Sequence, residues 1–139
     1  MPILLSEINF LAVLVAALTN FLIGGVWYSP MLFARLWMKE LDTNPVEAPQ
    51  PGSVARAFLG AFFCALVTAV FLSIFIVATQ TYSGFGGAEI GFLAALGFVA
   101  TSLGTNFLFE KRSRILYQIT AGHHILAFTV MGAILGGWR

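Results

Sequence analysis

Charged residues are scarce in this sequence. Only 9% of its 139 residues are charged, whereas 59% are hydrophobic. A soluble domain has about 25% charged and about 45–50% apolar residues, and a water-soluble core of this size could not bury so much apolar surface. The natural solvent is therefore lipid. The net charge of +1 also excludes a nucleic-acid-binding protein that depends on bulk positive charge.

Cysteine and histidine are almost absent. The single cysteine, Cys64, excludes an intrachain disulfide and any metal site built from several cysteines. The two histidines, His123 and His124, are adjacent and lack a second ligand three or four residues away. We therefore expect no metal and no cofactor. We interpret the pair as hydrogen-bonded structural histidines, with a proton-transfer or ligand-binding role as the first alternative and metal or haem ligation as the second.

Long apolar runs are what the sequence does contain. A helix needs about 20 residues to cross the hydrocarbon of a bilayer, and its backbone must satisfy its own hydrogen bonds there. The sequence therefore predicts an all-α integral membrane bundle of four transmembrane helices, forming a single domain over residues 1–139. The four helices are expected at about 8–28, 54–79, 88–109 and 115–138.

The joint between the first two helices is more polar. Ser29 can cap a helix and Pro30 suits a first helical position, so a short helix is expected at 30–41. Its apolar side chains share one face and its cations another, which is typical of a helix lying in the membrane interface. Residues 42–53 contain three prolines and are expected to form an irregular linker.

The distribution of cations predicts an orientation. Only Arg139 falls on the side of the chain termini, whereas six cations fall at the first and third joints. By the positive-inside rule, both joints face the cytoplasm and both termini lie outside it. The six cations are Arg35, Lys39, Arg56, Lys111, Arg112 and Arg114.

Three asparagines lie in or beside the apolar runs. Asn9 and Asn20 are about three helical turns apart, so they share one stripe. The third helix carries a comparable stripe of Ala95, Val99, Ser102, Asn106 and Glu110. We expect both stripes to face protein and to form interhelical hydrogen bonds, with a ligand or ion pathway as the alternative. Asn20 and Asn106 should lie within about one water-mediated contact, with His123 or His124 approaching them.

The basic turn "EKRSR" precedes the fourth helix. Lys111, Arg112 and Arg114 cluster there, and Tyr117 follows one turn later. The free N–H groups at the start of the fourth helix add positive character. These four residues form a candidate site for anionic lipid headgroups. The alternative is that the cations only anchor the hairpin and set its orientation.

Small residues recur at a spacing of four, which lets helix backbones approach closely. This pattern predicts a homo-oligomer or a complex with another membrane protein. The clearest series are Ala57-Ala61-Ala65-Ala69, Gly87-Gly91-Ala95 and Gly132-Gly136.

Several motifs resemble those of a known family. They are "N-F-L-A-V" from Asn9, "G-G-V-W-Y-S-P" from Gly24, "N-F-L-F-E-K-R" from Asn106 and "M-G-A-I-L-G-G-W" from Met131. Together they resemble the bacterial membrane proteins grouped as domain of unknown function seventeen-sixty-one, over essentially the whole chain. The resemblance implies a small four-helix membrane protein. It brings no established activity, so no catalytic residue is assigned.

Three classes of function fit these observations. The sequence favours a non-enzymatic scaffold or accessory component. A small carrier or channel is the first alternative, but Glu7, Glu89 and Glu110 lie at helix ends, which argues against cation–proton exchange. The second is a membrane enzyme that binds an anionic thiol or lipid at the cytoplasmic edge, using Arg112, Arg114, Tyr117 and the histidines.

The orientation can be tested by labelling. A cysteine introduced near residue 47 should react with a membrane-impermeant maleimide only after the cells are permeabilised, because the first joint faces the cytoplasm. Rapid labelling of intact cells at that position would reverse the orientation.

Overall fold

The computed structural model describes residues 2–41 and 51–138. Within these ranges the structure is helical without strands, and four helical spans are long and apolar enough to cross a membrane. The predicted all-α class with four such helices is therefore confirmed. The spans are α2 (Phe10–Trp27), α4 (Pro51–Ala78), the continuous run of α5 (Gly84–Ala94), η1 (Ala95–Ala100) and α6 (Thr101–Phe109), and α7 (Arg114–Gly137).

A short helix, α1 (Pro2–Ser6), precedes the first span and was not expected from the sequence. Asn9 separates it from α2. The side-chain oxygen of Asn9 accepts hydrogen bonds from the backbone N–H groups of Leu11, at 3.1 Å, and Ala12, at 3.2 Å. Asn9 is thus the N-cap of α2, which explains why the helix begins at Phe10.

The joint after α2 differs from the expected one at Ser29. Its hydroxyl donates to the carbonyl of Val26, at 2.6 Å, so Ser29 bonds back to the preceding helix. The next helix, α3 (Ala34–Leu41), therefore begins four residues after Pro30. Most of the expected linker lies outside the described residues, and α4 begins at the last of its prolines, Pro51.

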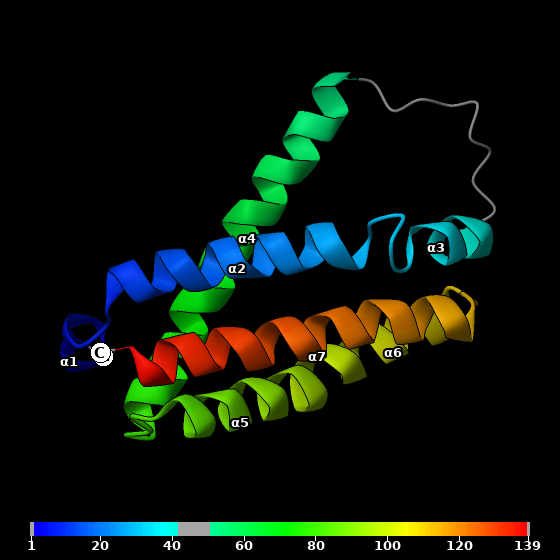
Figure 1. The fold of residues 1–139 in the computed structure, drawn as a ribbon. Helices are drawn as coiled ribbons and strands as arrows, with labels where there is room; N and C mark the ends of the chain where they lie inside the picture. Colours follow the sequence, from blue (N-terminus) through cyan, green and yellow to red (C-terminus); the bar gives the residue numbers. More distant parts are fainter. Residues whose placement is uncertain (1, 42–50, 139) are drawn as a thin grey trace.

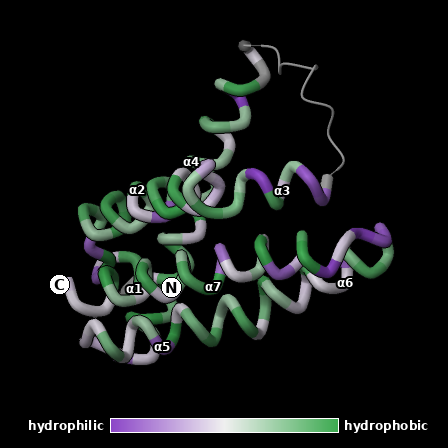
Figure 2. The backbone as a smooth tube through the Cα atoms, turned by 45° about the vertical axis from the view of Figure 1, so that its right-hand side comes forward, coloured by the Kyte–Doolittle hydropathy of each residue, from purple (hydrophilic) through white to green (hydrophobic). Residues whose placement is uncertain are grey.

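Helix α7 is central to the packing. It contacts α2, α3, α4, α5, η1 and α6, and Figure 1 shows α2, α7 and the α5–α6 run lying along one another. Small side chains make up much of the core, including Ala12, Ala16 and Ala69, around the larger Ile76 and Met131. Polar segments gather at α3 and at the turn between α6 and α7 (Figure 2), which share one end of the bundle.

The closest approach of two helices is between α5 and α7. A Cβ atom on Gly87 would overlap the carbonyl oxygen of Gly132, and one on Gly132 would overlap that of Gly87. One turn further, a Cβ atom on Gly91 would overlap the carbonyl oxygen of Phe128. The two backbones touch because these positions lack side chains, which is how small residues hold helices together in lipid.

The third span contains a π-helical turn, η1, and this turn changes which side faces inward. A π-helix has a wider turn than an α-helix, with i→i+5 hydrogen bonds. The buried positions accordingly run from Ala95 to Ala100, a step of five, and then to Phe107. Asn106 is exposed on the surface of the chain. The expectation that Asn106 lies inside, beside Asn20, is wrong because it assumed a constant helical period across η1.

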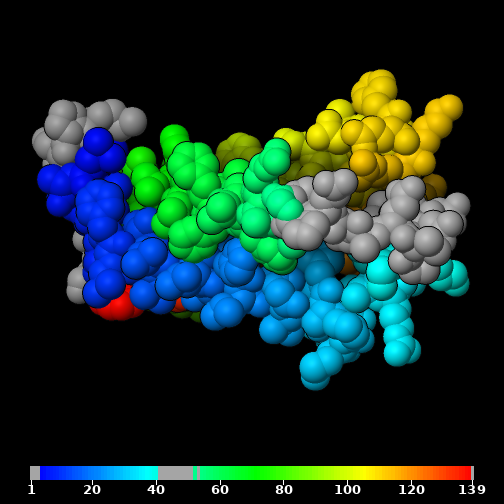
Figure 3. Space-filling model, turned by 90° about the horizontal axis from the view of Figure 1, so that it is seen from above, coloured from blue at the N-terminus to red at the C-terminus, as the bar shows by residue number. Residues whose placement is uncertain are grey.

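Helix α4 has two different halves. From Ala65 onward it contributes Ala65, Ala69, Leu72 and Ile76 to the core. Residues 55–61 are all exposed, and Figures 1 and 2 show this end of α4 rising away from the other helices. Seen from above (Figure 3), α4 forms part of the molecular surface beside α2. The first half of α4 is therefore unpacked within the part of the chain that the structure describes.

The glycine contact leads to a stability prediction. Gly132→Ala should lower the free energy of unfolding by about 1–3 kcal/mol, because the new methyl group forces α5 and α7 apart. Thermal unfolding in a mild detergent measures the effect. Gly97→Ala is the matched control, since a Cβ atom there would meet no described atom within 4 Å. Equal stability of the two variants would contradict the close contact.

Candidate functional site

A cavity of about 640 Å³ lies between α2, α4 and α7. We call it the histidine cavity. Most of its wall is apolar or aromatic. The polar side chains that line it are Asn20, Tyr28, Cys64, Thr68, His123 and His124. The structure therefore places Asn20 and both histidines at the wall of one cavity, whereas the other two asparagines lie elsewhere.

His123 reaches the cavity from α7 and lies against α2. A Cβ atom on Gly24 would be 3.3 Å from His123 Nε2, so the imidazole fits only because position 24 has no side chain. The ring centroid of His123 is 5.5 Å from that of Tyr28 and 6.4 Å from that of Trp27. Nε2 is buried and has no hydrogen-bond partner among the described residues. The expected structural hydrogen bond at this nitrogen is not formed.

His124 points differently, because adjacent residues on a helix are about 100° apart. Its ring centroid is 5.1 Å from that of His123 and 6.3 Å from that of Phe128. Among the described residues, no three His, Cys, Asp or Glu side chains are grouped in a way that could hold a metal ion. The histidine cavity thus offers neutral hydrogen-bonding groups in an apolar setting.

Trp27 fixes the end of α2 to α7. Its indole Nε1 donates to the carbonyl oxygen of Ile119 at 2.9 Å, and a Cβ atom on Gly122 would lie 3.1 Å from its ring. The ring also packs on Phe33, with centroids 4.7 Å apart. The sequence alone did not predict this contact. The signal in the sequence was Gly122, because a large ring can pack closely against a position that has no side chain.

The other two asparagines are not in the cavity. Asn9 caps α2, and its amide nitrogen lies 3.5 Å from the carbonyl oxygen of Trp138, which is at the weak limit of a hydrogen bond. Asn106 is exposed on α6, beyond η1. The polar stripe read from Asn9 and Asn20 is therefore divided between a helix cap and the histidine cavity.

A second cavity, of about 430 Å³, lies at the turn between α6 and α7. We call it the basic-turn cavity. All four residues of the candidate anion site line it: Lys111, Arg112, Arg114 and Tyr117. The turn itself is made by Lys111, whose φ of 55° is in the left-handed region.

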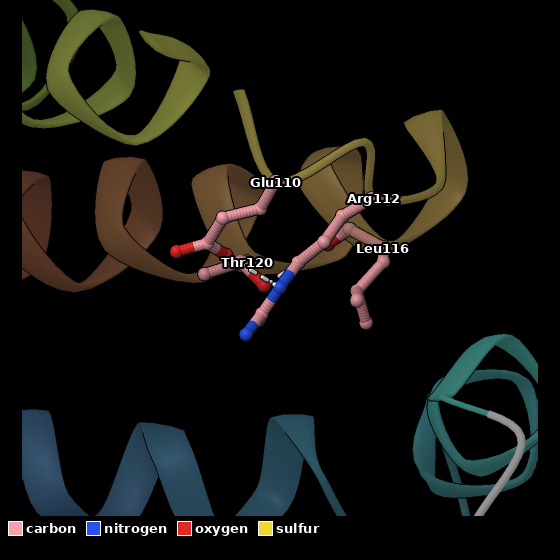
Figure 4. Close-up of polar contacts among 4 residues, drawn as sticks. All are labelled: Glu110, Arg112, Leu116 and Thr120. Atoms are coloured by element: carbon pink, nitrogen blue, oxygen red, sulfur yellow. Dashed lines mark hydrogen bonds and ion pairs between the residues drawn. The ribbon is translucent and has the colours of Figure 1, made fainter. Parts of the chain in front are cut away.

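Contacts in this turn modify the expected anion site. Arg112 Nε lies 2.7 Å from Glu110 Oε2 (Figure 4). The guanidinium carbon of Arg112 lies 5.5 Å from the centroid of the Phe107 ring. Both side chains of the ion pair are about half exposed, so the pair is weak and an anionic ligand can compete for Arg112. Figure 4 also shows Thr120, whose hydroxyl donates to the carbonyl oxygen of Leu116 at 2.9 Å.

Two further groups in the basic-turn cavity are already engaged. Ser113 Oγ accepts hydrogen bonds from the N–H groups of Ile115 and Leu116, so these groups are not free to hold an anion. The hydroxyl of Tyr117 donates to the carbonyl oxygen of Ala100 at 2.8 Å. Tyr117 therefore ties α7 to the end of η1. The positive character expected from the helix terminus is reduced, and the three cations carry the charge.

The packing of the other three apolar spans around α7, with polar ends and an internal cavity, defines a small multi-pass helical membrane protein. A family model described as protein of unknown function (DUF1761) matches residues 11–136, and the chain belongs to this family. The resemblance indicated by the sequence motifs is thereby confirmed. No curated protein and no solved structure matches the chain.

The basic-turn cavity leads to a prediction about lipid. Replacing Lys111, Arg112 and Arg114 together by Gln should lower the amount of acidic lipid that co-purifies with the protein, because each cation near an anionic surface contributes about 1 kcal/mol. Lipid mass spectrometry after purification in mild detergent measures the change.

The control for this prediction removes three cations elsewhere. Arg35, Lys39 and Arg56 are exposed and lie outside the basic-turn cavity. Their triple replacement by Gln gives the same net charge and should leave the bound acidic lipid nearly unchanged. An equal loss from both triple variants would show that only the total charge matters.

Proposed function

We propose that this protein is a non-enzymatic component of the bacterial inner membrane, with both termini outside the cytoplasm. It acts as a scaffold or accessory subunit by packing against another transmembrane helix. The observation that supports this role is the unpacked first half of α4, where residues 55–61 are all exposed. Exposed large side chains alone would suit lipid, but this segment also carries small residues.

The small residues distinguish this surface from an ordinary lipid-facing one. Ala57, Gly60 and Ala61 lie close together on the exposed half of α4. In lipid, helices associate where small residues let their backbones approach closely. The hydrophobic effect does not drive this association, because the acyl chains are as apolar as the side chains of the helices. The same helix already uses this device inside the chain, where Ala65 and Ala69 are buried against the core. The spacing of four continues from that contact into the open half.

A second copy of the chain is the partner that this surface fits. A two-fold axis would place the small residues of α4 against the same residues of another α4, and such self-complementary contacts are the commonest basis of homodimers. The open half also ends at Cys64, the single cysteine of the chain, which is exposed. On a helix, Cys64 lies about 20° from Ala57 and about 40° from Gly60, so it should lie near the axis.

Oxidative crosslinking in native membranes tests this arrangement. Treatment with copper phenanthroline should give a disulfide-linked dimer of the native protein, because two Cys64 thiols would meet across the axis. The control is Leu59→Cys combined with Cys64→Ser. Leu59 is 72% exposed but lies about 140° around the helix from Cys64.

The control variant should form much less crosslinked dimer than the native protein. Equal crosslinking from both positions would reflect random collision, and no crosslinking through Cys64 would exclude the symmetric contact. A further variant, Ala57→Leu, keeps Cys64 but blocks close approach of the backbones, so it should reduce the dimer strongly.

A further inference from the structure

The histidine cavity contains a polar atom that the chain itself does not satisfy. His123 Nε2 is buried, and no described residue hydrogen-bonds to it. Buried polar atoms nearly always have a partner, so an exception at a cavity wall indicates a group supplied from outside the chain. The imidazole lies close to α2 at this point, since a Cβ atom on Gly24 would be 3.3 Å from Nε2.

The walls of the cavity define what could supply that group. Aromatic side chains come from three helices: Phe21 and Tyr28, Phe58, and Phe128. Asp, Glu, Lys and Arg are not among the described residues that line it, so a charged molecule would find no counter-ion there. The volume of about 640 Å³ falls in the range of pockets that hold small organic molecules. A neutral molecule with a mainly apolar body fits these walls.

The cavity borders the lipid-facing surface of the chain. Phe21 on α2 and Phe58 on α4 meet edge to face, with ring centroids 5.7 Å apart, and both side chains are exposed. The N-terminal end of α4 rises away from α2 (Figure 1). A molecule dissolved in the bilayer could therefore enter between the two helices and leave its apolar tail in the lipid.

We propose that the histidine cavity binds a neutral, lipid-soluble molecule that presents a hydroxyl or carbonyl oxygen to His123 Nε2. The nitrogen of a neutral imidazole donates or accepts according to its tautomer, so either kind of oxygen can complete the bond. Quinones and neutral glycerides share this chemistry. The aromatic side chains favour a flat ring beside the imidazole. This inference goes beyond the proposed scaffold function, and the cavity shares Ala61 and Cys64 with the α4 surface described above.

Native mass spectrometry of the purified full chain tests the proposal. The probes are decylubiquinone and dioctanoylglycerol, titrated separately from a mild detergent. At least one should bind as one molecule per chain, and the probe that binds identifies the source of the oxygen. His123→Leu should weaken that binding at least ten-fold. The control is Thr129→Val on the same helix, which keeps the side-chain shape and should leave the affinity unchanged.

A second variant keeps the histidine and closes the space beside it. Gly24→Ala would place a methyl group 3.3 Å from His123 Nε2, so it should weaken binding at least several-fold even if His123→Leu fails to fold. Its control is Gly97→Ala, since a Cβ atom there would meet no described atom within 4 Å and position 97 lies outside the cavity lining. The proposal is overturned if the native chain binds neither probe, or if Gly24→Ala and His123→Leu both bind as tightly as the native chain.

Discussion

The backbone contact between α5 and α7 is the interaction on which the rest of the structure depends. In lipid, apolar side chains gain little by leaving acyl chains for one another, so helices are held by close packing. Gly87, Gly91 and Gly132 allow that packing over successive turns. With α7 held against α5 in this way, another side of α7 contacts α2 and α4. The two histidines lie on that side and line the cavity between those helices.

Helix α4 separates from the bundle at its N-terminal end (Figure 1). The core holds only its second half, through Ala65, Ala69 and Ile76. Phe21 fills part of the angle between α2 and α4 by meeting Phe58 and Phe62 edge to face. The angle is too wide for these rings to close it, and the histidine cavity is what remains between the helices.

The number and type of the apolar spans could be predicted from the sequence because they depend on length and hydropathy alone. The direction in which a side chain points depends on an unbroken helical period, and η1 interrupts that period in a run of ALGFVA that carries no proline or other evident signal. Asn106 was therefore placed on the wrong side. The helix caps were harder to predict. Ser29 could form hydrogen bonds with the helix before it or with the helix after it, and only the three-dimensional path of the chain determines which.

The candidate sites were predictable to different degrees. The basic-turn residues are neighbours in sequence, so their meeting in one cavity follows from the turn itself. The histidine cavity combines residues about 100 positions apart, and Asn20 was matched to the histidines by depth in the membrane rather than by any motif. The roles of Gly24 and Trp27 could not be foreseen, because each is defined by a side chain on α7 that lies against it.

The π-helical turn lets the third span hold one residue more than a regular α-helix of the same phase. An α-helix turns about 100° for each residue, so a chain one residue shorter within Ala95–Ala100 could run as a regular α-helix through this segment. Phe107 would still face inward and Asn106 would stay exposed, because the step of five from Ala95 to Ala100 would become the ordinary step of four. Among related chains, length in this segment is therefore a property to compare before any position of α6 is aligned by residue type, since an alignment that omits a one-residue gap there would match inner positions with outer ones.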